Sequence, residues 1–171
     1  RRAITSLQQQ SIPVDKLIIV DGGSTDATKQ VAQDIDSITN FAIDFYEIDG
    51  AGVRFSSQFG AEKAAEHLRQ TGNATDGVIL RLEGDSALEE TFVETAINYL
   101  SEGSYSVFGA PVNPHQPRNE RVKKRFFSLL QNSDGLPKGR GMAFKPEDFY
   151  AVNGYKIKPD ERIQFSDIDC L

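Results

Sequence analysis

Short apolar runs alternate with amphipathic segments along the first two thirds of the chain. Apolar runs bounded by polar residues or glycine predict buried strands, and they lie at 17–20, 41–48, 78–82 and 105–110. Apolar residues at helical spacing predict helices at 1–10, 27–35, 57–69 and 92–100. Strands that alternate with helices in this way predict an α/β fold with a parallel-rich central sheet flanked by helices.

The pattern changes after residue 112. A polar, proline-broken loop at 113–119 precedes a predicted helix at 120–130, with Arg121, Lys123, Lys124 and Arg125 among its polar positions. Residues 135–145 are glycine-rich and then extended, and Pro146 begins a short helix that runs to Val152, since proline suits the first turn.

Length and charge restrict the class of protein. A chain of 171 residues forms one ordinary domain, and its net charge of −6 gives no general attraction to nucleic acid. The single cysteine, Cys170, excludes an internal disulfide, and no apolar run is long enough to span a bilayer. Both ends fall inside predicted elements, so we expect part of a longer protein, in which a membrane anchor outside this chain stays open.

Two carboxylates follow the apolar run at 78–82. Glu83 and Asp85 stand one residue apart, and on a continued strand they would share a face. Open α/β sheets bind ligands beyond the carboxyl ends of their strands, and carboxylate oxygens there suit Mg²⁺ or Mn²⁺ held together with phosphates. The alternative is that both acids simply begin the next helix, whose N-terminus favours negative charge.

A second candidate lies at the end of the strand at 17–20. Asp21 is followed by Gly22-Gly23-Ser24-Thr25-Asp26, in which the glycines allow a tight turn and Ser24 or Thr25 is a candidate helix cap. The alternative role for Asp21 is to stabilise that turn through its own side chain.

Two further candidates are basic. Lys138 and Arg140, in the glycine-rich loop at 135–145, are candidate phosphate ligands.

Three ordered stretches together resemble the family 2 glycosyltransferases. Residues 18–26 (IIVDGGSTD) are similar to the family's V-D-D-G-S-T-D, and residues 80–86 (LRLEGDS) to its D-x-D motif. Residues 141–169, which end in Ser166-Asp167-Ile168-Asp169, resemble the acceptor-side segment that closes on E-D-x-D. The resemblance implies a GT-A fold in one domain over 1–171, with a nucleotide-sugar-binding half (1–112) and an acceptor-side half (113–171). It also implies that the family's first strand precedes residue 1.

The resemblance assigns roles to individual residues. It implies that Asp21 lies near the nucleotide base, that Asp85 binds the metal and that Glu83 lies near the ribose and the metal. Asp167 matches the proposed catalytic base, for which burial or the neighbouring Asp169 would raise the pKa; its structural alternative is a helix cap or a surface acid. Together with Arg140, these residues make up most of the predicted site.

The sequence also departs from the family pattern. Gly22 stands where many members have a second Asp, and Ser57 stands where A-R-N has its arginine, so that Arg54 or Lys63 would have to replace that charge. We keep Gly22 and Ser57 as predicted substrate-binding positions. Ser166 replaces the Glu that precedes the base.

The function implied by the resemblance is metal-assisted transfer of a sugar, with inversion, from a nucleotide-diphosphate-sugar to an acceptor hydroxyl. The acceptor is a saccharide, a lipid carrier or another hydroxyl compound, and the expected location is the cytoplasm or the cytoplasmic face of a membrane. Two alternatives stay open: a non-catalytic sugar-nucleotide-binding domain, and a nucleotidyltransferase that makes sugar nucleotides.

Overall fold

The computed structural model describes residues 2–103, 106–109 and 141–155. In these ranges the elements follow one another as α1 (Arg2–Gln8), β1 (Lys16–Asp21), α2 (Thr28–Asp36), β2 (Ala42–Glu47), α3 (Val53–Gln70), β3 (Ile79–Leu82), α4 (Phe92–Ser101), β4 (Val107–Gly109), β5 (Gly141–Phe144) and α6 (Pro146–Ala151). The predicted alternation of strands and helices is therefore confirmed from residue 2 to residue 109.

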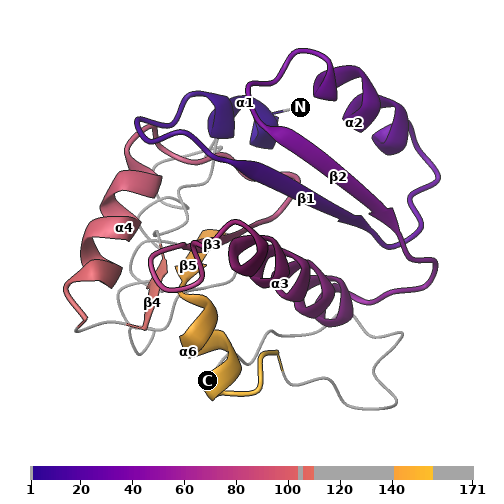
Figure 1. Cartoon of the computed structure of the whole chain (residues 1–171). Helices are drawn as coiled ribbons and strands as arrows, with labels where there is room; N and C mark the ends of the chain where they lie inside the picture. The colour runs from indigo at the N-terminus through magenta and orange to yellow at the C-terminus, as the bar shows by residue number, and fades with distance from the viewer. Residues whose placement is uncertain (1, 104–105, 110–140, 156–171) are drawn as a thin grey trace, which may run out of the picture.

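Strands β1 and β2 form a parallel pair. Lys16 lies opposite Ala42 and Asp21 lies opposite Glu47, so that both strands end at the same edge. Figure 1 shows α1 and α2 on one side of this pair and α3 on the other. The connection through α2 brings the chain back to the end of the sheet where β1 began, so that β2 can run parallel to β1.

Strands β3, β5 and β4 form a second ladder, with β5 in the middle. Strand β5 runs antiparallel to both neighbours: Ile79 of β3 and Val107 of β4 lie opposite Phe144. All four residues of β5 are buried, as expected for a central strand. The sequence predicted that this stretch is extended, but it gave no sign that the stretch separates two strands that run in the same direction.

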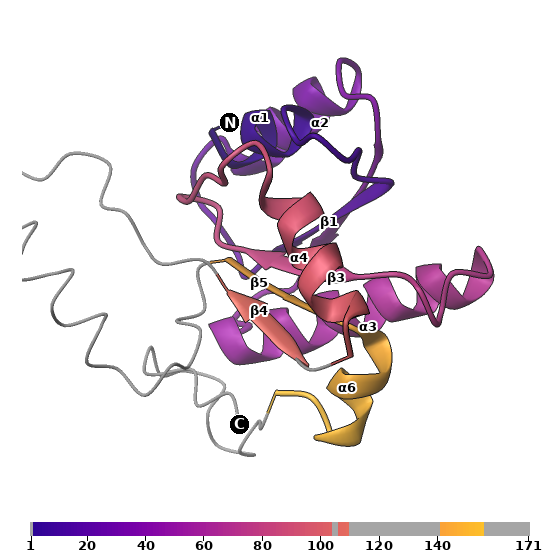
Figure 2. The same ribbon diagram turned by 90° about the vertical axis from the view of Figure 1, so that its left-hand side faces the viewer.

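Helices α3 and α4 lie on the two faces of this ladder (Figures 1 and 2), and an apolar cluster packs under each helix. On the α3 side, Ala61 and Ala65 pack with Ile79, Phe144 and other buried residues. On the α4 side the buried residues are Phe92, Ala96, Leu100 and Ala143. The alternation along β5, with Phe144 facing α3 and Ala143 facing α4, follows from the two-residue period of a strand.

Helix boundaries differ from the prediction in two places. Helix α3 begins at Val53, directly after an extended Gly52, rather than at residue 57. Helix α2 begins at Thr28, and the predicted caps are wrong: Asp26 accepts the hydrogen bonds of the Thr28 amide and hydroxyl. These bonds, chiefly the one from the hydroxyl, hold the pKa of Asp26 below its ordinary value. The predicted helix at 120–130 and the loop at 113–119 lie outside the described residues.

None of the helices within the described ranges is both long enough and apolar enough to cross a membrane.

The packing of Leu100 gives a test of the fold. Leu100 is 1% exposed, so Leu100→Ala should lower the free energy of unfolding by about 2–5 kcal/mol. Ile38 is 72% exposed, and Ile38→Ala should change it by no more than about 0.5 kcal/mol. Denaturant unfolding of both variants measures the difference, and equal losses would contradict this account of the α4 cluster.

Candidate functional site

The candidate site is organised by α3. This helix contacts both β1 and β3, and Gly60 faces β1, where an added Cβ would lie 3.4 Å from Val20 Cγ2, an ordinary van der Waals contact. Its N-terminus follows β2 after the short loop at 48–52 and therefore lies near the end of the sheet where β1 and β2 end. The candidate residues at the ends of β1 and β3 therefore lie on strands that both contact α3.

Asp21, the last residue of β1, is buried and holds the turn that follows it. Its Oδ1 accepts hydrogen bonds from the Ser24 amide (3.0 Å) and the Ser24 hydroxyl (2.6 Å). The turn-stabilising role is therefore present, and it uses one carboxylate oxygen. No other described residue donates a hydrogen bond to the second oxygen, so the predicted ligand role is compatible with this geometry.

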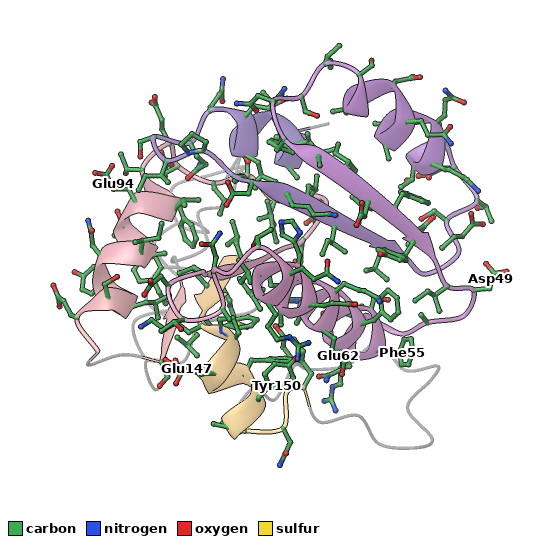
Figure 3. All side chains as sticks on the ribbon, in the orientation of Figure 1. Asp49, Phe55, Glu62, Glu94, Glu147 and Tyr150 are labelled. Carbon is green, nitrogen blue, oxygen red and sulfur yellow. The ribbon has the colours of Figure 1, made fainter. Side chains whose placement is uncertain are left out.

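The loop at 49–52 explains why residue 22 is glycine. A Cβ on Gly22 would lie 2.7 Å from the carbonyl oxygen of Ala51, closer than real contacts allow. Gly23 has φ +103°, and a Cβ there would lie 3.2 Å from Asp49 Oδ1. Figure 3 shows Asp49 in the loop after β2. Asp49 is a carboxylate beside this turn that the sequence analysis missed, since nothing in the sequence indicates which loop packs there.

Ser57 binds an arginine from another element. Arg81, on β3, donates from Nε to the Ser57 hydroxyl at 3.0 Å, and its Nη2 lies 3.6 Å from Glu83 Oε1. Lys63, one predicted replacement for the missing arginine, instead pairs with Glu66 at 2.9 Å. Arg81 is therefore a cation in direct contact with position 57, and the replacement by Arg54 stays a prediction. An arginine within an otherwise apolar strand was the signal available in the sequence.

Gln58 joins α3 to the segment after α6. Its Oε1 accepts a hydrogen bond from the Tyr155 amide at 2.7 Å, and its Nε2 donates to Glu62 at 2.6 Å. Glu62 is labelled on α3 in Figure 3. Consecutive residues of α3 thus reach β3 and the stretch that follows α6.

Glu83 and Asp85 lie in a turn beyond β3. The strand ends at Leu82, and the Ser86 amide donates to the Glu83 carbonyl oxygen at 3.0 Å. The expectation that both acids share one strand face is therefore wrong. The alternative, that they begin the next helix, is also wrong, because α4 begins only at Phe92. Asp85 is exposed and accepts a 3.3 Å hydrogen bond from the Ser86 hydroxyl.

The comparison with known proteins identifies the family. The sequence profile described as Glycosyl transferase family 2 matches residues 1–157. The chain belongs to this family. This confirms the predicted resemblance and the α/β fold class of GT-A type.

A related protein is the O-antigen chain rhamnosyltransferase RfbN of Salmonella typhimurium, which is 39% identical over 132 residues. The match covers 76% of this chain and 38% of that protein, so the chain corresponds to well under half of its relative. Among solved structures none matches significantly.

The family 2 site residues can be tested for their fit to a divalent metal. No group of three or more His, Cys, Asp or Glu side chains gathers in the part of the chain that the structure describes. A closed protein cage is therefore not formed there. The exposed Asp85, with Glu83 nearby in sequence, fits a Mg²⁺ or Mn²⁺ ion bound by one or two carboxylates and completed by substrate phosphates. Asp167 and Arg140 lie outside the described residues and stay predictions.

Substitution of Gly22 tests the close approach of the two loops. Gly22→Ala should lower the free energy of unfolding by about 1–3 kcal/mol, because the neighbouring atom is a backbone oxygen. Gly84→Ala is the matched control: neither glycine has a positive φ, and an added Cβ at Gly84 meets nothing within 4 Å. Thermal unfolding of both variants is the measurement; an unaffected Gly22→Ala protein would refute the contact with Ala51.

Proposed function

We propose that this chain is the catalytic domain, or part of it, of an inverting glycosyltransferase that uses a nucleotide-diphosphate-sugar. The observation that carries the proposal is the family match over residues 1–157. The geometry supports it, since Asp21 ends β1, Arg81 pairs with Ser57 and Glu83 near the end of β3, and α3 contacts both strands.

The relative suggests the class of substrate. RfbN is named as a rhamnosyltransferase of the O-antigen chain. We therefore propose a deoxyhexose such as rhamnose as the first donor sugar to test, and a saccharide hydroxyl, free or on a lipid carrier, as the acceptor. A reaction that extends such a saccharide would take place at the cytoplasmic face of a membrane, with any anchor supplied by parts outside this chain.

On this proposal the residues divide the work of donor binding. Asp21 accepts hydrogen bonds from the nucleotide base, and Glu83 contacts the ribose or the metal. Asp85 binds a divalent ion, which when bound supplies positive charge to the departing diphosphate. The first turn of α3 contains no acid and contributes the positive end of a helix dipole close to Ser57.

Transfer also needs a base for the acceptor. Asp167 takes the proton of the acceptor hydroxyl as its oxygen bonds to the anomeric carbon from the face opposite the diphosphate. The bond between that carbon and the diphosphate oxygen breaks in the same step, so the configuration is inverted and the electron pair leaves with the nucleoside diphosphate.

The role of Asp85 predicts metal-dependent donor binding. In the presence of Mn²⁺, the nucleotide-sugar that binds best in a panel should raise the Tm of the chain by about 5–10 °C when its concentration is about 100 times its dissociation constant. Asp85→Asn should weaken metal-dependent binding by about 10–100-fold or more. Asp76→Asn, an exposed acid just before β3, is the control and should bind normally. Failure of every nucleotide in the panel to stabilise the wild-type chain would count against the proposed function.

The role of Asp167 predicts a separate defect. Asp167→Asn should leave the dissociation constant of the donor within about twofold and lower kcat by about 100–10,000-fold, because only the proton acceptor is lost. Isothermal titration with the donor and a transfer assay with a saccharide acceptor measure the two quantities. Loss of donor binding as large as that in Asp85→Asn would show that Asp167 is not a base, and unchanged kcat would show the same.

A further inference from the structure

Arg81 is an unusual residue for its position. It lies within β3, on the strand face that carries the buried Ile79, and its side chain is only 10% exposed. Removing a guanidinium from water is costly unless the charge is paired and its donors are satisfied. The partners of Arg81 therefore indicate whether this charge is structural or serves a ligand.

The protein satisfies this guanidinium only in part. Nε donates to Ser57, but the Nη2 to Glu83 Oε1 separation of 3.6 Å is longer than a hydrogen bond. Nη1 is buried and has no hydrogen-bond partner among the residues that the structure describes. A guanidinium offers five N–H donors, and a buried donor without an acceptor is unfavourable, so an additional oxygen that reached Nη1 would remove this cost.

The surroundings favour a negatively polarised acceptor. Ser57 lies near the start of α3, an 18-residue helix whose first turn contains no acid and whose Gly52 N-cap gives no side-chain hydrogen bond. The other end of the guanidinium lies toward Glu83, which is 31% exposed, at the open end of β3. An oxygen arriving from that end meets the cation and the positive end of the helix dipole, together with the Glu83 carboxylate that lies 3.6 Å from Nη2.

We propose that Arg81 is a donor-binding residue whose Nη1 donates a hydrogen bond to an oxygen of the donor nucleotide, either a base carbonyl or a diphosphate oxygen. This inference rests on the proposed function. Ser57 fixes the guanidinium through Nε, and a small rotation about the last side-chain bonds presents Nη1 at the edge near Glu83. The cation that the family usually has at position 57 is in this way supplied from β3.

A purely structural arginine would behave differently on replacement. Replacing a buried ion pair by apolar side chains is often neutral or stabilising, whereas removing one partner is costly when the other charge stays buried. Glu83 is 31% exposed, so Arg81→Leu does not leave a fully buried charge behind. Arg81→Leu should therefore unfold at the same or a higher temperature without ligand, yet lose nucleotide affinity. Lysine keeps the charge but cannot bond to Ser57 and to a ligand in the same forked geometry, so Arg81→Lys should not restore binding.

The test is titration calorimetry of the whole chain with nucleoside diphosphates, the matching nucleosides and inorganic pyrophosphate. Arg81→Leu should weaken the best-bound nucleoside diphosphate by about 10–100-fold, and Ser57→Ala by a smaller factor through loss of the anchor. Lys63→Gln removes a cation that is paired elsewhere on α3 and should leave affinity unchanged. Parallel loss of pyrophosphate affinity assigns the contact to the diphosphate, whereas parallel loss of nucleoside affinity assigns it to the base.

The outcomes separate this inference from the proposed function. If Arg81→Leu and Ser57→Ala both bind nucleoside diphosphates as tightly as the wild-type chain, the proposed role of Arg81 is overturned and the proposed function is not affected. Should Arg81→Leu fail to fold, Ser57→Ala and Arg81→Lys still decide, because unchanged affinity in both overturns the role. A wild-type chain that binds no nucleotide overturns the proposed function and this inference together.

Discussion

The close approach of α3 to the strands is the constraint on which the site depends. Ala61 and Ala65 are buried, Ala65 completely, so at these positions the helix contributes only methyl groups to a cluster whose bulk comes from Ile79 of β3 and Met142 and Phe144 of β5. The same helix approaches β1 at Gly60. Because α3 is held this close, short side chains such as Ser57 and Gln58 reach partners on other elements. Larger residues at positions 61 and 65 would push α3 away from the sheet and would separate Ser57 from Arg81.

Two departures from the family pattern have local physical causes. Residue 22 has no room for a side chain, because the loop after β2 places the Ala51 carbonyl against it and brings Asp49 beside the neighbouring Gly23. Residue 57 is a serine that accepts a hydrogen bond from Arg81. In each place a charged side chain from a different element stands near the position where the family residue is missing, so the departures do not by themselves indicate a loss of activity.

The sequence predicted much of the fold because the apolar runs are short and the helices between them carry apolar residues at helical spacing. It predicted Asp21, Glu83 and Asp85 at strand ends, and the structure places them there. It did not predict that β5 lies between β3 and β4, since a four-residue strand carries no information about its neighbours. Nor did it predict the pairing of Arg81 with Ser57, because contacts between residues 24 positions apart depend on how the helix packs on the sheet. The roles of Asp167 and Arg140 stay predictions.

The contact between Ser57 and Arg81 makes these two positions a single unit divided between a helix and a strand. A guanidinium introduced at 57 would meet the one that already comes from 81, and like charges in a partly buried place repel. The family arrangement can therefore be restored only by a paired exchange, with arginine at 57 and an apolar residue at 81. A position-by-position comparison with the family finds no cation at residue 57. Considering residues 57 and 81 together shows a cation at the same place, supplied by the strand in place of the helix.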